Sequence, residues 1–229
     1  RPKSSAASDV YKRQDMDGVI IDSERTHYLA ICEAMGEGMK QSYETFLAKC
    51  TGRDERFAMG RLAELSGIEY DEELFQKWSF RKGRAYARLV SREAQAMPGA
   101  VELVLATAKQ LPIALATGSR RADVDAAFEV LAEGRLKGLF QSIVTSSEVA
   151  KPKPDPETYA RAVSEMGLQP EECWAIDDSP NGVASAWSAG LRVIGISGIH
   201  APEALAQAER VESSMRQISL HKLQDWFAR

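Results

Sequence analysis

Acidic residues are the first feature of this sequence that could do chemistry. Asp15 and Asp17 stand one residue apart, directly before Gly18, and Asp177 and Asp178 form a second acidic pair far along the chain. Carboxylates held close together repel each other and are costly to bury without a cation. A hard divalent ion with oxygen ligands, above all Mg²⁺, would satisfy such a site. The alternative for the first pair is a solvated turn, because Asp and Gly are common turn residues.

A second set of residues could hold or neutralise a phosphate. Thr117 offers a hydroxyl beside Gly118 and Ser119, and Lys153 offers an ammonium. Phosphoryl transfer requires charge neutralised on the moving group and a nucleophile held in line, and carboxylates can act as that nucleophile. Each residue alone also has a structural interpretation. The segment 117–119 can be a helix-capping turn, Lys153 a solvated loop charge, and the pair 177–178 a helix N-terminus, where acids are favoured.

The elements that must position these residues alternate between helix and strand from residue 97 onward. Helices are predicted at 101–110, 122–131, 156–166 and 181–189, and short apolar strands at 112–116, 142–145, 173–176 and 192–196. Residues 205–229 indicate a helix, a short edge strand and a last helix. The alternation favours an α/β fold with a doubly wound parallel sheet. Ligands of such sheets bind beyond the carboxyl ends of the strands, where Asp15, Thr117 and Asp177 are expected.

A helical insert interrupts this pattern. Residues 23–96 repeat apolar positions at spacings of three and four and carry no strand signal. Residues 97–99, Met-Pro-Gly, then break the last helix. We therefore expect a small all-α cap domain at 23–96, inserted into a core domain made of residues 15–22 and 97–229.

The first fourteen residues look foreign to this fold. A strand of a parallel sheet that is covered on both faces should be a near-continuous apolar run. The strand before Asp15 would instead end in Lys12, Arg13 and Gln14. Residues 8–14 also resemble the translation of an adapter used to build sequencing libraries. We therefore expect residues 1–14 to be a non-native segment; the alternative is a genuine basic arm.

Composition excludes several classes of partner. The 229 residues are 44% hydrophobic and 27% charged, which is typical of a soluble globular protein with a proper core. The formal net charge of −4 gives no sign of nucleic-acid or anionic-membrane binding, and no apolar run approaches the ~20 residues of a membrane span. The three scattered cysteines, Cys32, Cys50 and Cys173, indicate free thiols in a reducing compartment. We expect a cytoplasmic protein, a monomer or a weak dimer.

Four segments carry a family resemblance. DMDGV at 15–19, LATGS at 115–119, KPDPETY at 153–159 and IDDSPNG at 176–182 resemble, in order, the four motifs of the haloacid dehalogenase-like (HAD) phosphotransferase superfamily. The resemblance implies a Rossmann-like core, an aspartyl-phosphate intermediate and a Mg²⁺ cofactor. Dehalogenases with this fold lack the second acid of the first motif, so the presence of Asp17 favours phosphate chemistry.

The resemblance also implies a role for each motif residue. Asp15 matches the nucleophile, and Asp17 the general acid that protonates the leaving oxygen and later activates water. Thr117 matches the hydroxyl that holds phosphate oxygens with backbone N–H groups at Gly118 and Ser119. The Mg²⁺ ligands would be Asp15, the Asp17 carbonyl, Asp178 and, beside it, Asp177.

The lysine of the third motif requires a choice, because both Lys151 and Lys153 precede a proline. The motif continues with an acid and then an aromatic residue. Starting from Lys153 places Glu157 and Tyr159 at those positions, whereas starting from Lys151 places Glu157 where the aromatic residue belongs. Lys153 is therefore the predicted catalytic lysine.

Three cap residues resemble positions used by beta-phosphoglucomutase and related sugar-phosphate enzymes. His27, Arg53 and Lys82 would form a cationic trio that faces the core, binds a second phosphate or assists proton transfer. Arginine suits bidentate phosphate binding. The alternative is that these are ordinary residues of charged cap helices. The mutase pattern also runs Gly-Val-Ser where this chain has Thr51 and Gly52.

These observations predict a Mg²⁺-dependent phosphatase that acts on a small phosphorylated metabolite, with a sugar phosphate foremost. The first alternative is a beta-phosphoglucomutase-like isomerase, which returns the phosphoryl group to a sugar hydroxyl instead of water. The second is a binding protein without catalytic activity on the same scaffold, against which the four intact motifs argue.

Overall fold

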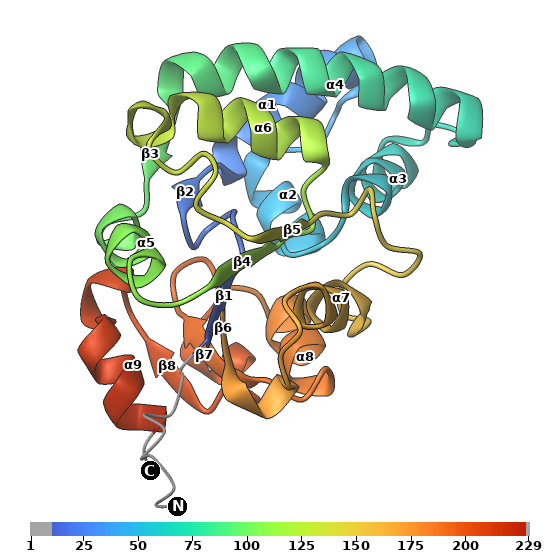
Figure 1. Ribbon diagram of the computed structural model, residues 1–229. Helices are drawn as coiled ribbons and strands as arrows, with labels where there is room; N and C mark the ends of the chain where they lie inside the picture. The colour runs from blue at the N-terminus through green and yellow to red at the C-terminus, as the bar shows by residue number, and fades with distance from the viewer. Residues whose placement is uncertain (1–10, 228–229) are drawn as a thin grey trace, which may run out of the picture.

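A six-stranded sheet forms the centre of the molecule (Figure 1). The computed structural model describes residues 11–227, so residues 1–10 of the predicted non-native segment lie outside it. The strands follow the order β5-β4-β1-β6-β7-β8, and every neighbouring pair is parallel. Their bounds are β1 Tyr11–Gln14, β4 Ile113–Ala116, β5 Ser142–Val144, β6 Cys173–Asp177, β7 Arg192–Ile196 and β8 Arg210–Glu212. The predicted doubly wound α/β fold is confirmed.

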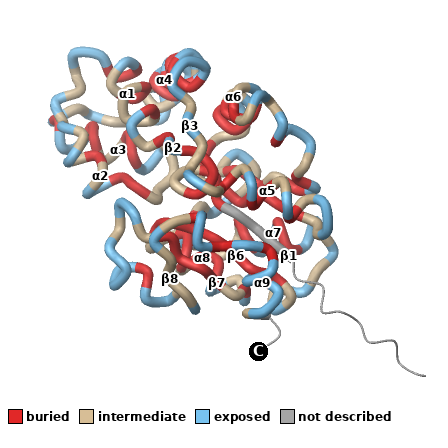
Figure 2. The backbone as a smooth tube through the Cα atoms, turned by 90° about the vertical axis from the view of Figure 1, so that its left-hand side faces the viewer, coloured by how far each residue is buried: buried red, intermediate tan, exposed pale blue. Residues whose placement is uncertain are grey.

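Helices cover both faces of the sheet, which explains why β4 and the first four residues of β6 are uninterrupted apolar runs. Successive residues of a strand point to opposite faces. In β4, Ile113 and Leu115 belong to the cluster under α5 and α9, whereas Ala114 and Ala116 belong to the cluster under α7 and α8. The helices are α5 Ala100–Ala108, α6 Arg121–Val130, α7 Glu157–Glu165, α8 Pro180–Ser188 and α9 Leu220–Phe227. Figure 2 shows β6 and β7 as mostly buried, with exposed residues on the outer sides of the surrounding helices.

The insert forms four helices beyond the carboxyl end of the sheet (Figure 1): α1 Glu24–Met35, α2 Tyr43–Cys50, α3 Glu55–Ser66 and α4 Glu72–Glu93. Asp54 and Asp71 cap α3 and α4, since their carboxylates accept hydrogen bonds from the backbone N–H groups of Phe57 and Leu74. The helices pack on one another around a cluster of their own that includes Phe46, Met59, Leu62 and Trp78. The predicted all-α cap on the α/β core is confirmed.

The cap joins the core through a small ribbon that the sequence did not indicate. Strand β2, Ile21–Asp22, pairs antiparallel with β3, Gln95–Ala96, where the chain enters and leaves the cap. The prediction that residues 23–96 contain no strand is therefore wrong at 95–96. Two-residue strands are too short to produce a periodic pattern, and only their pairing defines them.

Three ends of elements also differ from the predictions. Helix α7 begins at Glu157, so Pro156 precedes it, and the Asp155 carboxylate accepts a hydrogen bond from the Glu157 N–H at 3.0 Å. Helix α8 is capped by Ser179, whose hydroxyl accepts from the Gly182 N–H, rather than by the preceding acids. The expected edge strand near the C-terminus is β8, but a short 3-10 turn precedes it in place of a helix. The 3-10 turns are η1 Gly36–Gly38, η2 Leu131–Gly134, η3 Pro170–Glu172, η4 Pro202–Leu205 and η5 Met215–Gln217.

Strand β1 lies at the centre of the sheet, between β4 and β6. Its pairing uses backbone groups that any residue except proline provides. The pairing of β1 therefore does not test the side chains of this segment, and the non-native origin of residues 1–14 stays a prediction. Within the described part of the chain, no helix combines the length and apolar character that a membrane span needs.

Candidate active site

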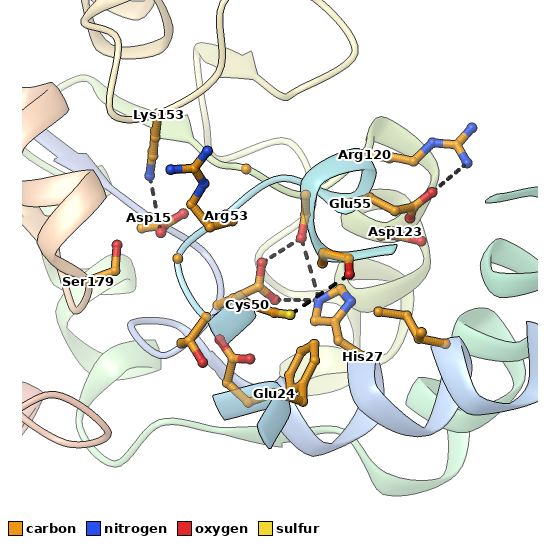
Figure 3. Close-up of a pocket in the computed structure, with 18 of the residues that line it drawn as sticks. Asp15, Glu24, His27, Cys50, Arg53, Glu55, Arg120, Asp123, Lys153 and Ser179 are labelled. Carbon is orange, nitrogen blue, oxygen red and sulfur yellow. Dashed lines mark hydrogen bonds and ion pairs between the residues drawn. The ribbon is translucent and has the colours of Figure 1, made fainter. Parts of the chain in front are cut away.

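A pocket of about 80 Å³ lies between the carboxyl end of the sheet and the cap (Figure 3). The core contributes residues from the loops that follow β1, β4 and β6 and from the loop before α7. The cap contributes residues from α1, α4 and the loop between α2 and α3. Most of the predicted site residues line this pocket, namely Asp15, Asp17, His27, Arg53, Lys82, Gly118, Ser119, Lys153 and Asp178.

Lys153 is buried beside two carboxylates. Its ammonium nitrogen lies 3.1 Å from Oδ2 of Asp15 and 2.8 Å from Oδ2 of Asp177. Burial alone lowers the pKa of Lys153, but Asp15 and Asp177 raise it above its ordinary value, so the ammonium stays charged. Lys151, the alternative third-motif lysine, is exposed. The geometry therefore favours Lys153.

Asp177 is a fully buried carboxylate, and each of its two oxygens accepts hydrogen bonds from neighbouring groups. Oδ2 accepts hydrogen bonds from Lys153 and from the Tyr159 hydroxyl, both at 2.8 Å. Oδ1 accepts from the Ser179 N–H at 3.0 Å and from the Ser179 hydroxyl at 2.9 Å. Asp177 thus positions Lys153. Sequence reasoning used Tyr159 only to choose the register of the motif and did not predict this contact.

Three buried carboxylates could hold a metal ion. Oxygens of Asp15, Asp177 and Asp178 all lie within 4.8 Å of one another. Burial raises the pKa of Asp15 to about 7 despite the opposing charge of Lys153, and burial with the charges of Asp177 and Asp15 raises that of Asp178 well above its ordinary value. Such shifts mark a site with more negative charge than its protein cations neutralise. The oxygens of Asp15, Asp177 and Asp178 together fit a hard divalent cation, and Asp177 is the one that makes the most hydrogen bonds within the protein.

Gly18 is the residue that allows Asp178 to reach this cluster. Its φ is +71°, a left-handed conformation that side chains rarely adopt. A Cβ atom at this position would also lie 2.0 Å from Oδ2 of Asp178. Glycine is therefore required both for the turn after β1 and for the close approach of the second acidic pair.

Asp17 links the core to the first cap helix. Its Oδ2 accepts a hydrogen bond from the Ser119 hydroxyl at 2.5 Å, and its Oδ1 lies 3.0 Å from Nε2 of His27 and accepts from the Ser23 hydroxyl. His27 stacks on Tyr86 of α4. Burial alone raises the pKa of Asp17, but the neighbouring imidazole and the hydroxyl donors lower it below its ordinary value. The carboxylate is thus ionised in this arrangement.

The second motif forms a tight turn after β4. The Thr117 hydroxyl oxygen is fully buried and accepts a hydrogen bond from the Ser119 N–H at 3.0 Å. Gly118 faces open space, because a Cβ atom there would meet nothing within 4 Å. Gly118 and Ser119 line the pocket, whereas Thr117 supports their turn from behind. The predicted contact of Thr117 with a phosphate stays a prediction.

The three predicted cap cations have different environments. The Arg53 guanidinium lies over the Phe57 ring at 3.8 Å, and its buried Nε has no hydrogen-bond partner among the described residues. His27 is paired with Asp17. Lys82 is buried 2.5 Å from Oδ2 of Asp123 and 3.0 Å from Oε2 of Glu55. The trio is therefore not a set of free cations: Lys82 is neutralised by two acids, one of them on the core helix α6.

Several pocket residues were missed by sequence reasoning. Glu24 and Cys50 line the pocket from the cap, whereas Asp123 of α6 and Arg120, directly before α6, line it from the core. Arg120 bonds to Ser79 and lies 3.4 Å from Oε1 of Glu55. These residues lie in helices or directly before one, without a motif of their own, and only the approach of the cap to the core brings them to the site.

Comparison with known proteins assigns the family. Residues 15–190 match the haloacid dehalogenase-like hydrolase family. The chain belongs to the haloacid dehalogenase-like hydrolases. The resemblance of the four motifs is thereby confirmed, and the chain is a hydrolase rather than a binding protein on a related scaffold.

Relatives within the family differ in their reactions. Protein CbbY of Rhodobacter capsulatus is 34% identical over 187 residues, which cover 79% of this chain and 82% of the relative. The fructose-1-phosphate phosphatase YqaB of Escherichia coli K12 is 28% identical over 183 residues, 80% of this chain and 93% of the relative. A crystal structure of beta-phosphoglucomutase from Clostridium difficile superposes with a TM-score of 0.83 at 22% identity, over 96% of this chain and 97% of that one. The last likeness concerns the fold alone.

Proposed function

We propose that this chain is a Mg²⁺-dependent phosphatase that hydrolyses a sugar phosphate through an aspartyl phosphate on Asp15. The observation that carries the proposal is the position of the Asp15 carboxylate. It lies at the floor of a pocket beneath the cap, 3.1 Å from the ammonium of Lys153 and within the carboxylate cluster that includes Asp178. Fructose-1-phosphate phosphatase activity in a relative supports the substrate class.

The first half of the reaction forms a bond between an Asp15 oxygen and phosphorus while the ester P–O bond breaks. Lys153 neutralises charge on the moving phosphoryl group, and the backbone N–H of Gly118, at the open side of the turn after β4, would hold one of its oxygens. A Mg²⁺ ion held by Asp15 and Asp178 would supply further charge neutralisation. Asp17 delivers a proton to the leaving oxygen, and His27, 3.0 Å away, can supply Asp17 with that proton.

The second half hydrolyses the aspartyl phosphate. Asp17, now ionised, accepts a proton from water as the water oxygen attacks phosphorus and the bond to Asp15 breaks. The hydrogen bonds from Ser119, Ser23 and His27 suit this step, because they stabilise an ionised Asp17. The step regenerates the free carboxylate of Asp15 and releases inorganic phosphate.

The mutase reaction is the second candidate. Arg53 favours it, because a guanidinium whose buried Nε has no hydrogen-bond partner in the described part of the chain could hold a second phosphate. Neutralisation of Lys82 by Glu55 and Asp123 weakens it, since a bisphosphate intermediate needs more than one free cation. Dependence on a sugar bisphosphate primer, with little free phosphate released, would distinguish the mutase from the phosphatase.

The test is phosphate release from a panel of sugar phosphates and phosphoglycolate, with Mg²⁺ and with EDTA. We expect release that requires the metal and falls to background in the Asp15→Asn variant. A second version of the protein, in which an apolar strand sequence replaces residues 10–14, is assayed beside the parent and tests whether the first segment impairs the enzyme. Activity of Asp15→Asn close to that of the parent would overturn the assignment, and so would a well-folded repaired chain that is inactive on every monoester.

A further inference from the structure

Glu24 is a carboxylate of the pocket that the proposed reaction does not use. It is the first residue of α1, directly after Ser23, and lines the pocket with Asp17 and His27 (Figure 3). Asp17 is held by three side chains and Asp177 by four groups, whereas no hydrogen bond or ion pair to Glu24 occurs among the side chains that the structure describes. The Glu24 carboxylate is therefore available to a ligand.

The surroundings of Glu24 disfavour the ionised form of its carboxyl group. Burial raises the pKa of Glu24 to about 7, and the charges of Asp17 and Asp22 add to the effect against the opposing influence of His27. The imidazole of His27, whose influence opposes this shift, already lies 3.0 Å from Oδ1 of Asp17. Glu24 is half-buried, and a half-buried acid without a partner among the described side chains is typical of a functional position. A substrate that displaces water from this part of the pocket would have to supply the hydrogen-bond donors for Glu24.

The pocket also has two chemically different sides. Asp15, Lys153 and the unpaired Nε of Arg53 mark the side that suits a phosphoryl group. In the view of Figure 3, Cys50 separates Glu24 from Arg53. An acidic side chain there accepts hydrogen bonds from hydroxyl groups and repels a carboxylate or a second phosphate.

We propose that Glu24 selects the leaving group of the substrate by accepting hydrogen bonds from the hydroxyl groups of a sugar or polyol monophosphate. The inference rests on the proposed phosphatase function and gives it a substrate class. It excludes, as preferred substrates, monoesters without hydroxyl groups and monoesters that carry a carboxylate near the ester carbon. Glu24 is thus a specificity residue, in contact with the leaving group rather than with the phosphoryl group.

The test compares substrates that differ only in hydroxyl groups. Glycerol 1-phosphate and propyl phosphate share a three-carbon chain, so the ratio of their kcat/KM values measures recognition of the hydroxyls. We expect a ratio well above one for the parent chain, a lower ratio for Glu24→Gln, and a ratio roughly 10- to 100-fold lower for Glu24→Ala, the range of one hydrogen bond to a charged group. Relative activity on phosphoglycolate should rise in both variants.

A matched control is Glu33→Gln, which removes an exposed acid from the same helix. It should leave the ratio unchanged, and thermal unfolding of each variant shows whether it is folded. A ratio that stays the same in folded Glu24→Ala would overturn the inference. So would a rise in the Mg²⁺ concentration needed for half-maximal rate with no change in the ratio, because Glu24 would then act on the metal site. Failure of the proposed function is distinguishable, since the parent chain would then release no phosphate from any monoester.

Discussion

The Lys153 ammonium lies 3.1 Å from the Asp15 carboxylate, although Asp15 precedes the cap insertion in the sequence and Lys153 follows it. Asp177, in turn, holds Lys153 at 2.8 Å and is itself fixed by Tyr159 and Ser179. The predicted nucleophile therefore meets a cation that is oriented before substrate arrives. Preorganised charge of this kind is a principal source of rate enhancement in phosphoryl transfer.

The first prediction concerns this lysine. Lys153→Met should lower kcat by at least about 100-fold, because the moving phosphoryl group loses a preorganised cation. It should also lower the free energy of unfolding at neutral pH by about 3–5 kcal/mol, since the buried acids Asp15 and Asp177 lose their counter-charge. Steady-state kinetics and denaturant titration measure the two effects.

Lys151→Met is the matched control, because Lys151 also precedes a proline but is exposed. It should change stability by less than about 0.5 kcal/mol and leave kcat close to the parent value. The opposite outcome, an inactive Lys151→Met beside an active Lys153→Met, would show that the third motif has been assigned in the wrong register.

The second prediction concerns Gly18. In Gly18→Ala the new methyl group would lie 2.0 Å from Oδ2 of Asp178, at a backbone φ of +71°. Asp178 must then move, so we expect Mg²⁺ affinity measured by calorimetry to fall at least about tenfold. Gly67→Ala has a similar φ of +72° with nothing within 4 Å. It should show only the backbone cost of about 1–2 kcal/mol and no change in metal affinity. Equal metal affinities in the two variants would exclude the role given to Gly18.

The sequence predicted the parts of the site that depend on the order of strands and helices along the chain. Gly118 and Asp178 come after the buried strands β4 and β6, and Asp15 directly follows β1. Parallel strands end at the same edge of the sheet, so the meeting of these residues follows from the alternation of elements. The contacts between the cap and the core could not be predicted from the order of the elements. Lys82 and Asp123 lie on α4 and α6, and their pairing depends on how the cap packs against the core. Glu24 carries no motif, and only the three-dimensional structure shows that no described side chain pairs with it.

The third prediction tests the environment of Lys82. Lys82→Met should lower the free energy of unfolding by about 3–5 kcal/mol, because Glu55 and Asp123 would remain buried without their cation. Lys77→Met, on the exposed side of the same helix, should change it by less than about 0.5 kcal/mol. If Lys82 instead binds a substrate phosphate directly, its removal would raise KM for that substrate and leave stability near the parent value.

The last prediction uses the pH dependence of stability at Glu24. Burial raises its pKa from 4.5 to about 7, so between these values the folded chain binds more protons at this site than the unfolded chain. The contribution of Glu24 to stability is therefore complete below about pH 4.5 and is lost as pH rises through about 7. Glu24→Gln removes this titration. In EDTA, the variant should match the parent near pH 4.5 and exceed it above pH 7, by at most about 3 kcal/mol in the free energy of unfolding.

Denaturant titrations of both chains at several pH values measure this difference, with Glu33→Gln as a control that should follow the parent throughout. A saturating substrate or product with hydroxyl groups should reduce the advantage of the variant, because it would provide the hydrogen bonds that the ionised Glu24 lacks. A difference that is constant across pH would show that Glu24 is solvated or paired in solution. Glu24 would then have no need of a donor from the substrate, and the basis for its role in selecting the leaving group would be removed.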